Sequence, residues 1–255
     1  MKKDLLIFGD SYGEEELVAY PPLHPMYKEY KKLKSFHSYL RESAEFRSVK
    51  SFAVGGSDLW SQYETFLESY TGNEIIIWFI THPGRIRTRS GSLLSNLPSC
   101  EHMLWEYEHG QYKNRNSDVQ IQELKAAIGF YMYLYNEDKE LFLHKKIIEE
   151  IQSLVPPSNL IMIDSFNTLG KKNAPSIGYA FGTENGVFVK SNDMADYYAL
   201  VKTHHDIRRN HMTDANHAIF AEELLTHIKT GASIDYKKFV RPSPEDFSMY
   251  FKPIT

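Results

Sequence analysis

The sequence predicts a three-layer α/β/α domain with a mainly parallel central sheet. Two observations lead to this fold class. Short apolar runs alternate with helical stretches along the chain, which is the pattern of strand–helix–strand units. After its first residue, the run from Glu74 to Ile80 (EIIIWFI) is entirely apolar, as expected of a central parallel strand that is buried on both faces. The 255 residues suffice for one large domain with a full core.

The first half of the chain contains three predicted strands, and each of them ends in a polar or glycine-rich turn. The apolar residues after Asp4 form the first strand, which runs into Gly9-Asp10-Ser11. A basic amphipathic helix is expected at about 28–43, and a second strand at 46–54 ends at Gly55-Gly56-Ser57. A helix follows at 59–70, with Thr71-Gly72 as its stop signal, before the third strand at 74–80.

The second half is predicted to begin with a polar, irregular insertion at about 84–117. One long helical stretch, or two helices, follows at about 119–153, and 159–163 reads as a fourth strand. A terminal helix is expected at about 214–229. This pattern places one domain at 1–230 and a C-terminal extension packed on it at 231–255.

Charge and cysteine content narrow the classes of function. A formal net charge of -4 gives no support to nucleic-acid binding. The single cysteine, Cys100, excludes an internal disulfide and fits a reducing compartment. The apolar run after Lys3 is too short for a signal-peptide core or a membrane span. We therefore expect a cytoplasmic protein with no membrane span.

Ser11 is the first candidate for chemistry. It follows a buried strand at the carboxyl edge of the predicted sheet, where ligands bind in open α/β folds. Gly, Asp and Ser are also ordinary turn and helix-cap residues, so a structural role is the alternative. A serine hydroxyl acts as a nucleophile only with a base, a group that orients the base, and donors for the oxyanion. The segment His204–His217 supplies histidines and aspartates for the first two roles.

With these motifs on the page, the chain resembles the SGNH (GDSL-type) serine hydrolase family of esterase- and lipase-like enzymes. Gly9-Asp10-Ser11 matches the family's first block, and Ala53-Val-Gly-Gly-Ser57 matches its second. Gly56 is the preferred equivalent of the family glycine, with Gly55 as the fallback. The family closes with an aspartate and a histidine just before its last helix, and candidates for both lie at the corresponding place here. The resemblance implies a flavodoxin-like SGNH fold and spans nearly the whole chain.

Two assignments of the histidine and aspartate are open. Asp214 and His217 have the family's spacing, but Thr213 is a good N-cap, which places both inside the first turn of the terminal helix. Aligned with the family's pre-helix stretch, His211 takes the catalytic position and Asp206 becomes the orienting carboxylate. Ser11, His211 and Asp206 are therefore the preferred triad, and Asp214 with His217 is the second choice.

The oxyanion block departs from the family pattern. The family has Gly-x-Asn-Asp after the third strand, where this chain reads Ile80-Thr-His-Pro-Gly-Arg85. Position for position, His82 replaces the donor asparagine, with Thr81 as the fallback. A neutral histidine donates one N–H, so His82 and the amides of Ser11 and Gly56 are the expected oxyanion donors.

The expected function is hydrolysis of carboxylic esters, most plausibly of a small acyl group such as O-acetyl on a saccharide. Arg85 and Tyr12 are the expected substrate-binding residues. The proposed chemistry needs no metal or organic cofactor. The main alternative is a weak or inactive SGNH-like carbohydrate-binding or structural module, motivated by the replaced asparagine.

Three further alternatives have less support. A nucleotide-binding loop after the first strand conflicts with Asp10 and the acidic residues 14–16, and no Gly-x-Gly-x-x-Gly or P-loop element is present. An ordinary α/β-hydrolase would carry a Gly-x-Ser-x-Gly elbow, which is missing. A metal site would draw on four histidines with no recognised ligand spacing: His204, His205, His211 and His217.

Overall fold

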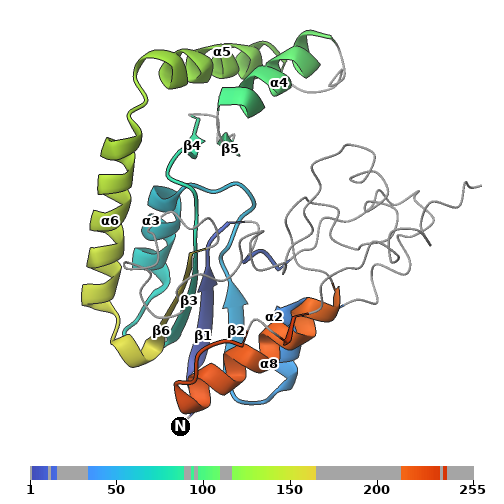
Figure 1. The fold of residues 1–255 in the computed structure, drawn as a ribbon, viewed down its shortest axis with the longest axis vertical. Helices are drawn as coiled ribbons and strands as arrows, with labels where there is room; N and C mark the ends of the chain where they lie inside the picture. The colour runs from blue at the N-terminus through green and yellow to red at the C-terminus, as the bar shows by residue number, and fades with distance from the viewer. Residues whose placement is uncertain are drawn as a thin grey trace, which may run out of the picture.

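The computed structural model describes residues 2–10, 13–15, 34–88, 93–94, 97–109, 117–164, 214–235 and 238–239. Four strands form a parallel sheet in the order β2-β1-β3-β6 (Figure 1). Their bounds are Asp4–Phe8 (β1), Ser48–Ser51 (β2), Ile75–Ile80 (β3) and Leu160–Asp164 (β6). This is the order of the first four strands in a flavodoxin-like sheet, and it reverses at β1 and β3.

Alternation along each strand divides the core into two halves. Leu5 and Ile7 of β1 face one half of the core, while Leu6 and Phe8 face the other. The register pairs Leu5 with Ile75 and continues to Phe8 and Trp78, so β3 divides its side chains in the same way. Because both faces are covered, β1, β3 and β6 are apolar at nearly every position, whereas the edge strand β2 (Ser48–Ser51) is mostly polar.

Helices cover both faces of the sheet and complete the three-layer fold (Figure 1). The helices α2 (Phe36–Glu42) and α8 (Asp214–Thr230) pack together over one face, where Phe36 and Phe220 join the core. The helices α3 (Leu59–Ser69) and α6 (Glu137–Leu154) cover the other face. Each of these last two begins at a side-chain cap: Asp58 accepts the Ser61 amide and Asn136 accepts the Lys139 amide, both at 2.9 Å.

The predicted irregular insertion at 84–117 is wrong for much of its length. It contains the short strands β4 (Ile86–Arg87) and β5 (Leu93–Leu94) and the helix α4 (Leu97–Glu108). The helix α4 packs against α5 (Ser117–Tyr133), and Cys100 lies buried between them with Leu124. The two helices stand away from the four-stranded sheet, beyond its carboxyl edge (Figure 1). The mixture of polar residues hid an amphipathic helix whose apolar side needs only one partner.

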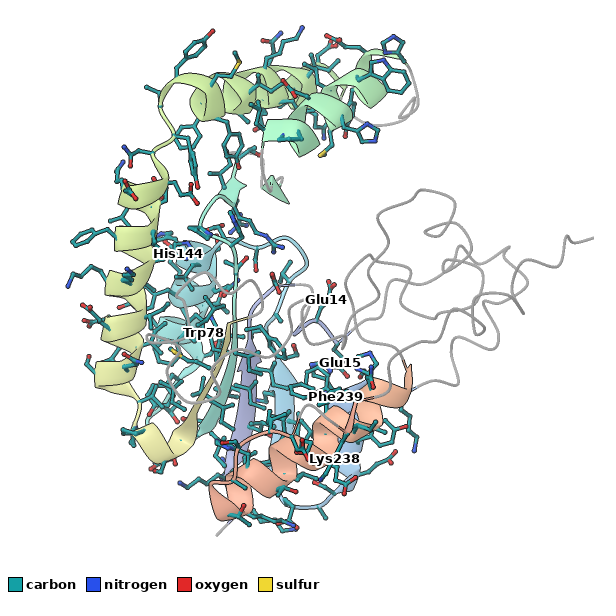
Figure 2. All side chains as sticks on the ribbon, viewed as in Figure 1. Glu14, Glu15, Trp78, His144, Lys238 and Phe239 are labelled. Atoms are coloured by element: carbon teal, nitrogen blue, oxygen red, sulfur yellow. The ribbon has the colours of Figure 1, made fainter. Side chains whose placement is uncertain are left out.

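The other predicted elements are confirmed where the structure describes them. The second strand is shorter than expected, and of the two alternatives for 119–153 the structure has two helices, α5 and α6. A short 3-10 helix (Pro157–Asn159) leads into β6. Of the predicted basic helix at 28–43, residues 28–33 lie outside the described residues. In the predicted C-terminal extension, Ile234 and Phe239 are buried in the core beside α8 (Figure 2).

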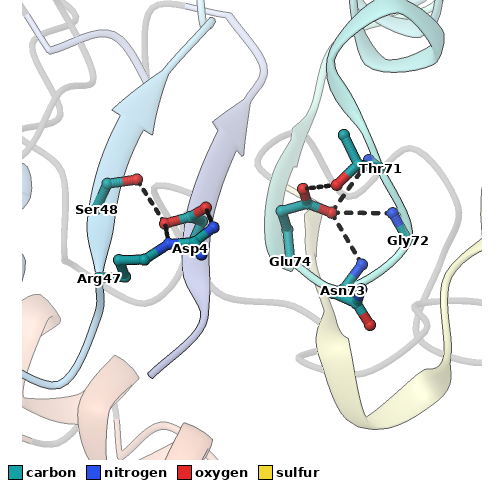
Figure 3. A network of polar contacts seen from close by, with 7 residues as sticks. All are labelled: Asp4, Arg47, Ser48, Thr71, Gly72, Asn73 and Glu74. Atoms are coloured by element: carbon teal, nitrogen blue, oxygen red, sulfur yellow. Dashed lines mark hydrogen bonds and ion pairs between the residues drawn. The ribbon is translucent and has the colours of Figure 1, made fainter. Parts of the chain in front are cut away.

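At the amino edge of the sheet, polar contacts lie at the starts of three strands, β1, β2 and β3 (Figure 3). Asp4 accepts hydrogen bonds from the Arg47 guanidinium and from the Ser48 hydroxyl, which ties the start of β1 to the start of β2. Glu74 precedes β3 and accepts the amides of Thr71, Gly72 and Asn73 at 3.0–3.1 Å. These contacts fix the entry of three neighbouring strands.

Candidate functional site

The carboxyl edge of the sheet brings together the ends of β1, β2 and β3, which the sequence singled out. Gly9-Asp10 follows β1, Gly55-Gly56 follows β2, and Thr81–Arg85 follows β3. The point between β1 and β3, where the strand order reverses, is where open α/β sheets bind their ligands. The candidate site is defined by these three segments.

The turn after β1 is closely packed and held by several hydrogen bonds. Gly9 has a φ of 142°, and a Cβ placed on it would lie 2.6 Å from the Cβ of Phe79. The Gly13 amide donates to the Asp10 carbonyl at 3.0 Å. Ser11 and Tyr12 stand between these two residues in the sequence and lie outside the described residues.

Two side chains hold the far end of this turn. The Gly13 carbonyl accepts hydrogen bonds from His37 Nε2 at 2.9 Å and from the Ser51 hydroxyl at 3.0 Å. Burial lowers the pKa of His37 to about 3, so its ring is neutral with the proton on Nε2. His37 was not predicted as a site residue. Its position beside Phe36 in a helix does not indicate a contact with the turn.

The turn after β2 is tied to the turn after β1 through Gly9. The Gly9 carbonyl accepts the Val54 amide at 3.1 Å and the Ser57 hydroxyl at 2.9 Å. Ser57 in turn accepts from Gln62 Nε2 at 3.0 Å, and the Gln62 carbonyl oxygen accepts from the Trp78 indole at 2.7 Å. This buried chain of donors fixes the two turns against α3 and β3.

The two predicted glycine donors differ in conformation and in their contacts. Gly56 has a φ of 78°, a left-handed conformation that favours glycine. The amide of Gly55 donates to a carboxylate oxygen of Glu14 at 3.3 Å, so its hydrogen is already engaged. Figure 2 shows Glu14 near the carboxyl ends of the strands.

The loop after β3 orients His82. Its Nδ1 accepts the Gly84 amide at 3.0 Å, and its carbonyl accepts the Arg85 amide at 3.1 Å. Burial and the nearby Arg85 cation lower the pKa of His82, which keeps the ring neutral. Because Nδ1 accepts, the proton of the neutral ring lies on Nε2, which carries the one N–H of the His82 ring. The hydroxyl of Tyr131 donates to the Gly84 carbonyl and links this loop to α5.

A buried ion pair joins the turn after β1 to the loop after β3. The Arg85 guanidinium lies 2.8 Å from Asp10 Oδ2, and the two side chains are 10% and 0% exposed. The buried Thr81 hydroxyl, the predicted fallback donor, also points to Asp10 Oδ2 at 3.4 Å. Arg85, predicted as a substrate-binding residue, is thus engaged with Asp10. No local sequence pattern predicts this ion pair, because its two members follow different strands.

The structure describes only part of the proposed triad. His211 and Asp206 lie outside the described residues, as do His204 and His205. Asp214 is the first residue of α8 and His217 lies in its first turn, as the sequence predicted.

His217, the second-choice histidine, is buried between two helices. Its Nδ1 accepts the Phe36 amide at 3.4 Å, and its ring stacks on the Phe36 ring with the centroids 6.0 Å apart. These contacts join α8 to α2, which gives His217 a packing role.

A second histidine that sequence reasoning missed lies on α6. His144 is buried (Figure 2), and burial together with the nearby His82 lowers its pKa to about 4. It places a second neutral imidazole behind the loop of His82.

Within the described part of the chain, the structure has neither a metal-binding cluster nor a membrane-spanning helix. No group of three or more His, Cys, Asp or Glu side chains there is placed to hold a metal ion. None of the helices described has the length and apolar character that a membrane crossing requires.

No protein-family model matches the chain, and no curated protein matches it.

Proposed function

We propose that the protein is a serine hydrolase of the SGNH type that acts on carboxylic esters. The observation that carries the proposal is that three strand ends meet at one edge of the sheet: the end of β1, which Ser11 follows in the sequence, the turn at Gly55-Gly56 and the loop of His82. An esterase of this kind needs a nucleophile beside at least two N–H donors, and we assign these roles to residues of these segments.

In the proposed mechanism, Ser11 Oγ attacks the ester carbonyl and forms a tetrahedral intermediate. His211 takes the proton from Ser11 and later gives it to the leaving alkoxide, while Asp206 orients the imidazole. The amides of Ser11 and Gly56 and the Nε2–H of His82 stabilise the oxyanion. Water then attacks the acyl-enzyme by the same route in reverse, which releases the acid and restores Ser11.

The substrate proposed for this site is a small acyl ester, such as O-acetyl on a saccharide. The chemistry needs no metal or organic cofactor, because the nucleophile, the base and the donors are all protein groups. Tyr12, beside Ser11 in the sequence, is the residue proposed to contact the substrate.

A fluorophosphonate probe tests this proposal directly, because it reacts only with an activated serine. Wild-type protein should be labelled, and Ser11→Ala should not. On p-nitrophenyl esters of rising chain length, the acetyl ester should give the highest kcat/KM. Folded wild type that is neither labelled nor active would favour a non-catalytic, carbohydrate-binding or structural module.

The choice of histidine is tested in the same assay. His211→Ala should lose nearly all activity, while His217→Ala should lose thermal stability and keep its labelling. The opposite result would make Asp214 and His217 the catalytic pair.

A further inference from the structure

We propose that Arg85 is a positioning residue that holds the nucleophile turn against the oxyanion loop through Asp10. This inference rests on the proposed esterase function and reassigns Arg85 from contact with the substrate. Its basis is the ion pair between Arg85 and Asp10, which spans the place where the strand order reverses.

Asp10 and Arg85 belong to two different segments of the candidate site. Asp10 immediately precedes Ser11, and its carbonyl accepts the Gly13 amide. Arg85 ends the loop of His82, and its amide donates to the His82 carbonyl. A contact between Asp10 and Arg85 therefore fixes the distance between the nucleophile's turn and the proposed donor's loop.

The ion pair is also buried. Arg85 is only 10% exposed and Asp10 is fully buried, so little of the guanidinium faces solvent or a substrate. Removing two charges from water is costly, and replacing such a pair by apolar side chains is often neutral or stabilising. A role at the site gives a reason for keeping the pair there.

The ion pair also affects the charge near the proposed oxyanion. An uncompensated carboxylate on Asp10 would lie one residue from Ser11 and oppose the negative charge that develops on the oxyanion. Arg85 neutralises that carboxylate and leaves the field to the N–H donors. Arg85 thus serves the reaction without touching the substrate.

Four variants separate positioning from substrate binding: Arg85→Gln, Arg85→Lys, Asp10→Asn and the double variant Asp10→Asn/Arg85→Gln. The substrate is p-nitrophenyl acetate, which is neutral. We expect Arg85→Gln to lower kcat on the order of 100-fold, with KM within about twofold. The double variant should recover at least about tenfold of that loss, because it removes the unpaired carboxylate together with its partner.

A matched control and a folding check accompany the assay. Arg87→Gln removes an exposed arginine of the short strand β4, two residues after Arg85, and should leave kcat and KM unchanged. Thermal unfolding of every variant shows whether each is folded. If Arg85→Gln does not fold, Arg85→Lys and the double variant carry the test, and a double variant as inactive as Ser11→Ala would overturn the inference.

The remaining outcomes are also decisive. A raised KM at unchanged kcat in Arg85→Gln, strongest for esters of anionic acids, would make Arg85 a substrate contact and overturn the inference. A double variant no better than Arg85→Gln would overturn it as well. Failure of the proposed function looks different, because the wild type itself would then show neither labelling nor hydrolysis.

Discussion

The ion pairs at the two edges of the parallel sheet lie in opposite environments, one exposed and one buried. At the amino edge, the Arg47 side chain that pairs with Asp4 is 72% exposed (Figure 3). At the carboxyl edge, the Arg85 side chain that pairs with Asp10 is 10% exposed. An exposed pair contributes little to stability, whereas a buried pair carries a desolvation penalty. The ion pair at the amino edge therefore costs little desolvation, whereas the ion pair at the carboxyl edge carries the penalty of two buried charges.

The glycines at the two edges differ in the same way, and we expect them to give the largest contrast. Gly9 and Gly72 both have positive φ, at 142° and 110°. A Cβ on Gly9 would collide with Phe79, while nothing lies within 4 Å of a Cβ on Gly72. Gly9→Ala should lower the free energy of unfolding by about 3 kcal/mol or more, and Gly72→Ala by about 1 kcal/mol. Urea unfolding measures both, and equal losses would show that packing on Phe79 does not distinguish the edges.

Second in size is the effect of the proposed donor at the carboxyl edge. His82→Ala should lower kcat on p-nitrophenyl acetate on the order of 100-fold, because one oxyanion donor is lost. His82→Asn keeps a side-chain N–H and should retain more activity than His82→Ala. His109→Ala, an exposed histidine after α4, serves as the control and should not change kcat. Full activity in His82→Ala would remove His82 from the oxyanion hole.

The smallest effects are expected from the carboxylates of the amino edge, and they depend on pH. Burial raises the pKa of Glu74, but hydrogen bonds from Thr71, from Asn73 and from its own backbone amide outweigh the effect of burial and leave the pKa below its usual value of 4.5. Its contribution is therefore present above about pH 4.5 and is lost as the pH falls through the folded-state pKa. Glu74→Gln should reduce the free energy of unfolding at pH 7 by about 1–2 kcal/mol.

Asp4 provides the comparison at the same edge. Hydrogen bonds from Arg47 and Ser48 lower its pKa from 3.8 to about 2. Its contribution is thus complete above pH 3.8 and disappears as the pH falls toward about 2. Asp4→Asn should change stability less than Glu74→Gln, because Asp4 is more exposed, and it should flatten the wild-type loss of stability across that acidic window. Equal effects of the two variants at pH 7 would contradict the distinction between an exposed pair and a buried, fully bonded carboxylate.

Much of the fold could be predicted from the sequence because its signals are local. The apolar run of β3, the Asp58 cap of α3 and the first turn of α8 each follow from a few neighbouring residues. The helix α4 was missed although Cys100, Met103, Leu104 and Tyr107 recur at helical spacing, since the polar residues between them hid the pattern.

The candidate site was predicted less completely than the fold. Its turns were located from glycines and polar residues at strand ends, and His82 was predicted from its place after β3. His37 and the pairing of Asp10 with Arg85 were not predicted, because each depends on a contact between distant segments. No short-range pattern encodes such contacts.

The sequence by itself determined the four strands of the parallel sheet and that polar turns with Gly9, Gly56 and His82 end three of them. Only the tertiary structure decided that β1 lies between β2 and β3, which brings these turns to one edge. It also decided that Arg85 is buried against Asp10. The physical reason is that side-chain periodicity is set by neighbouring residues, whereas strand order and ion pairing depend on burial among segments far apart in the chain.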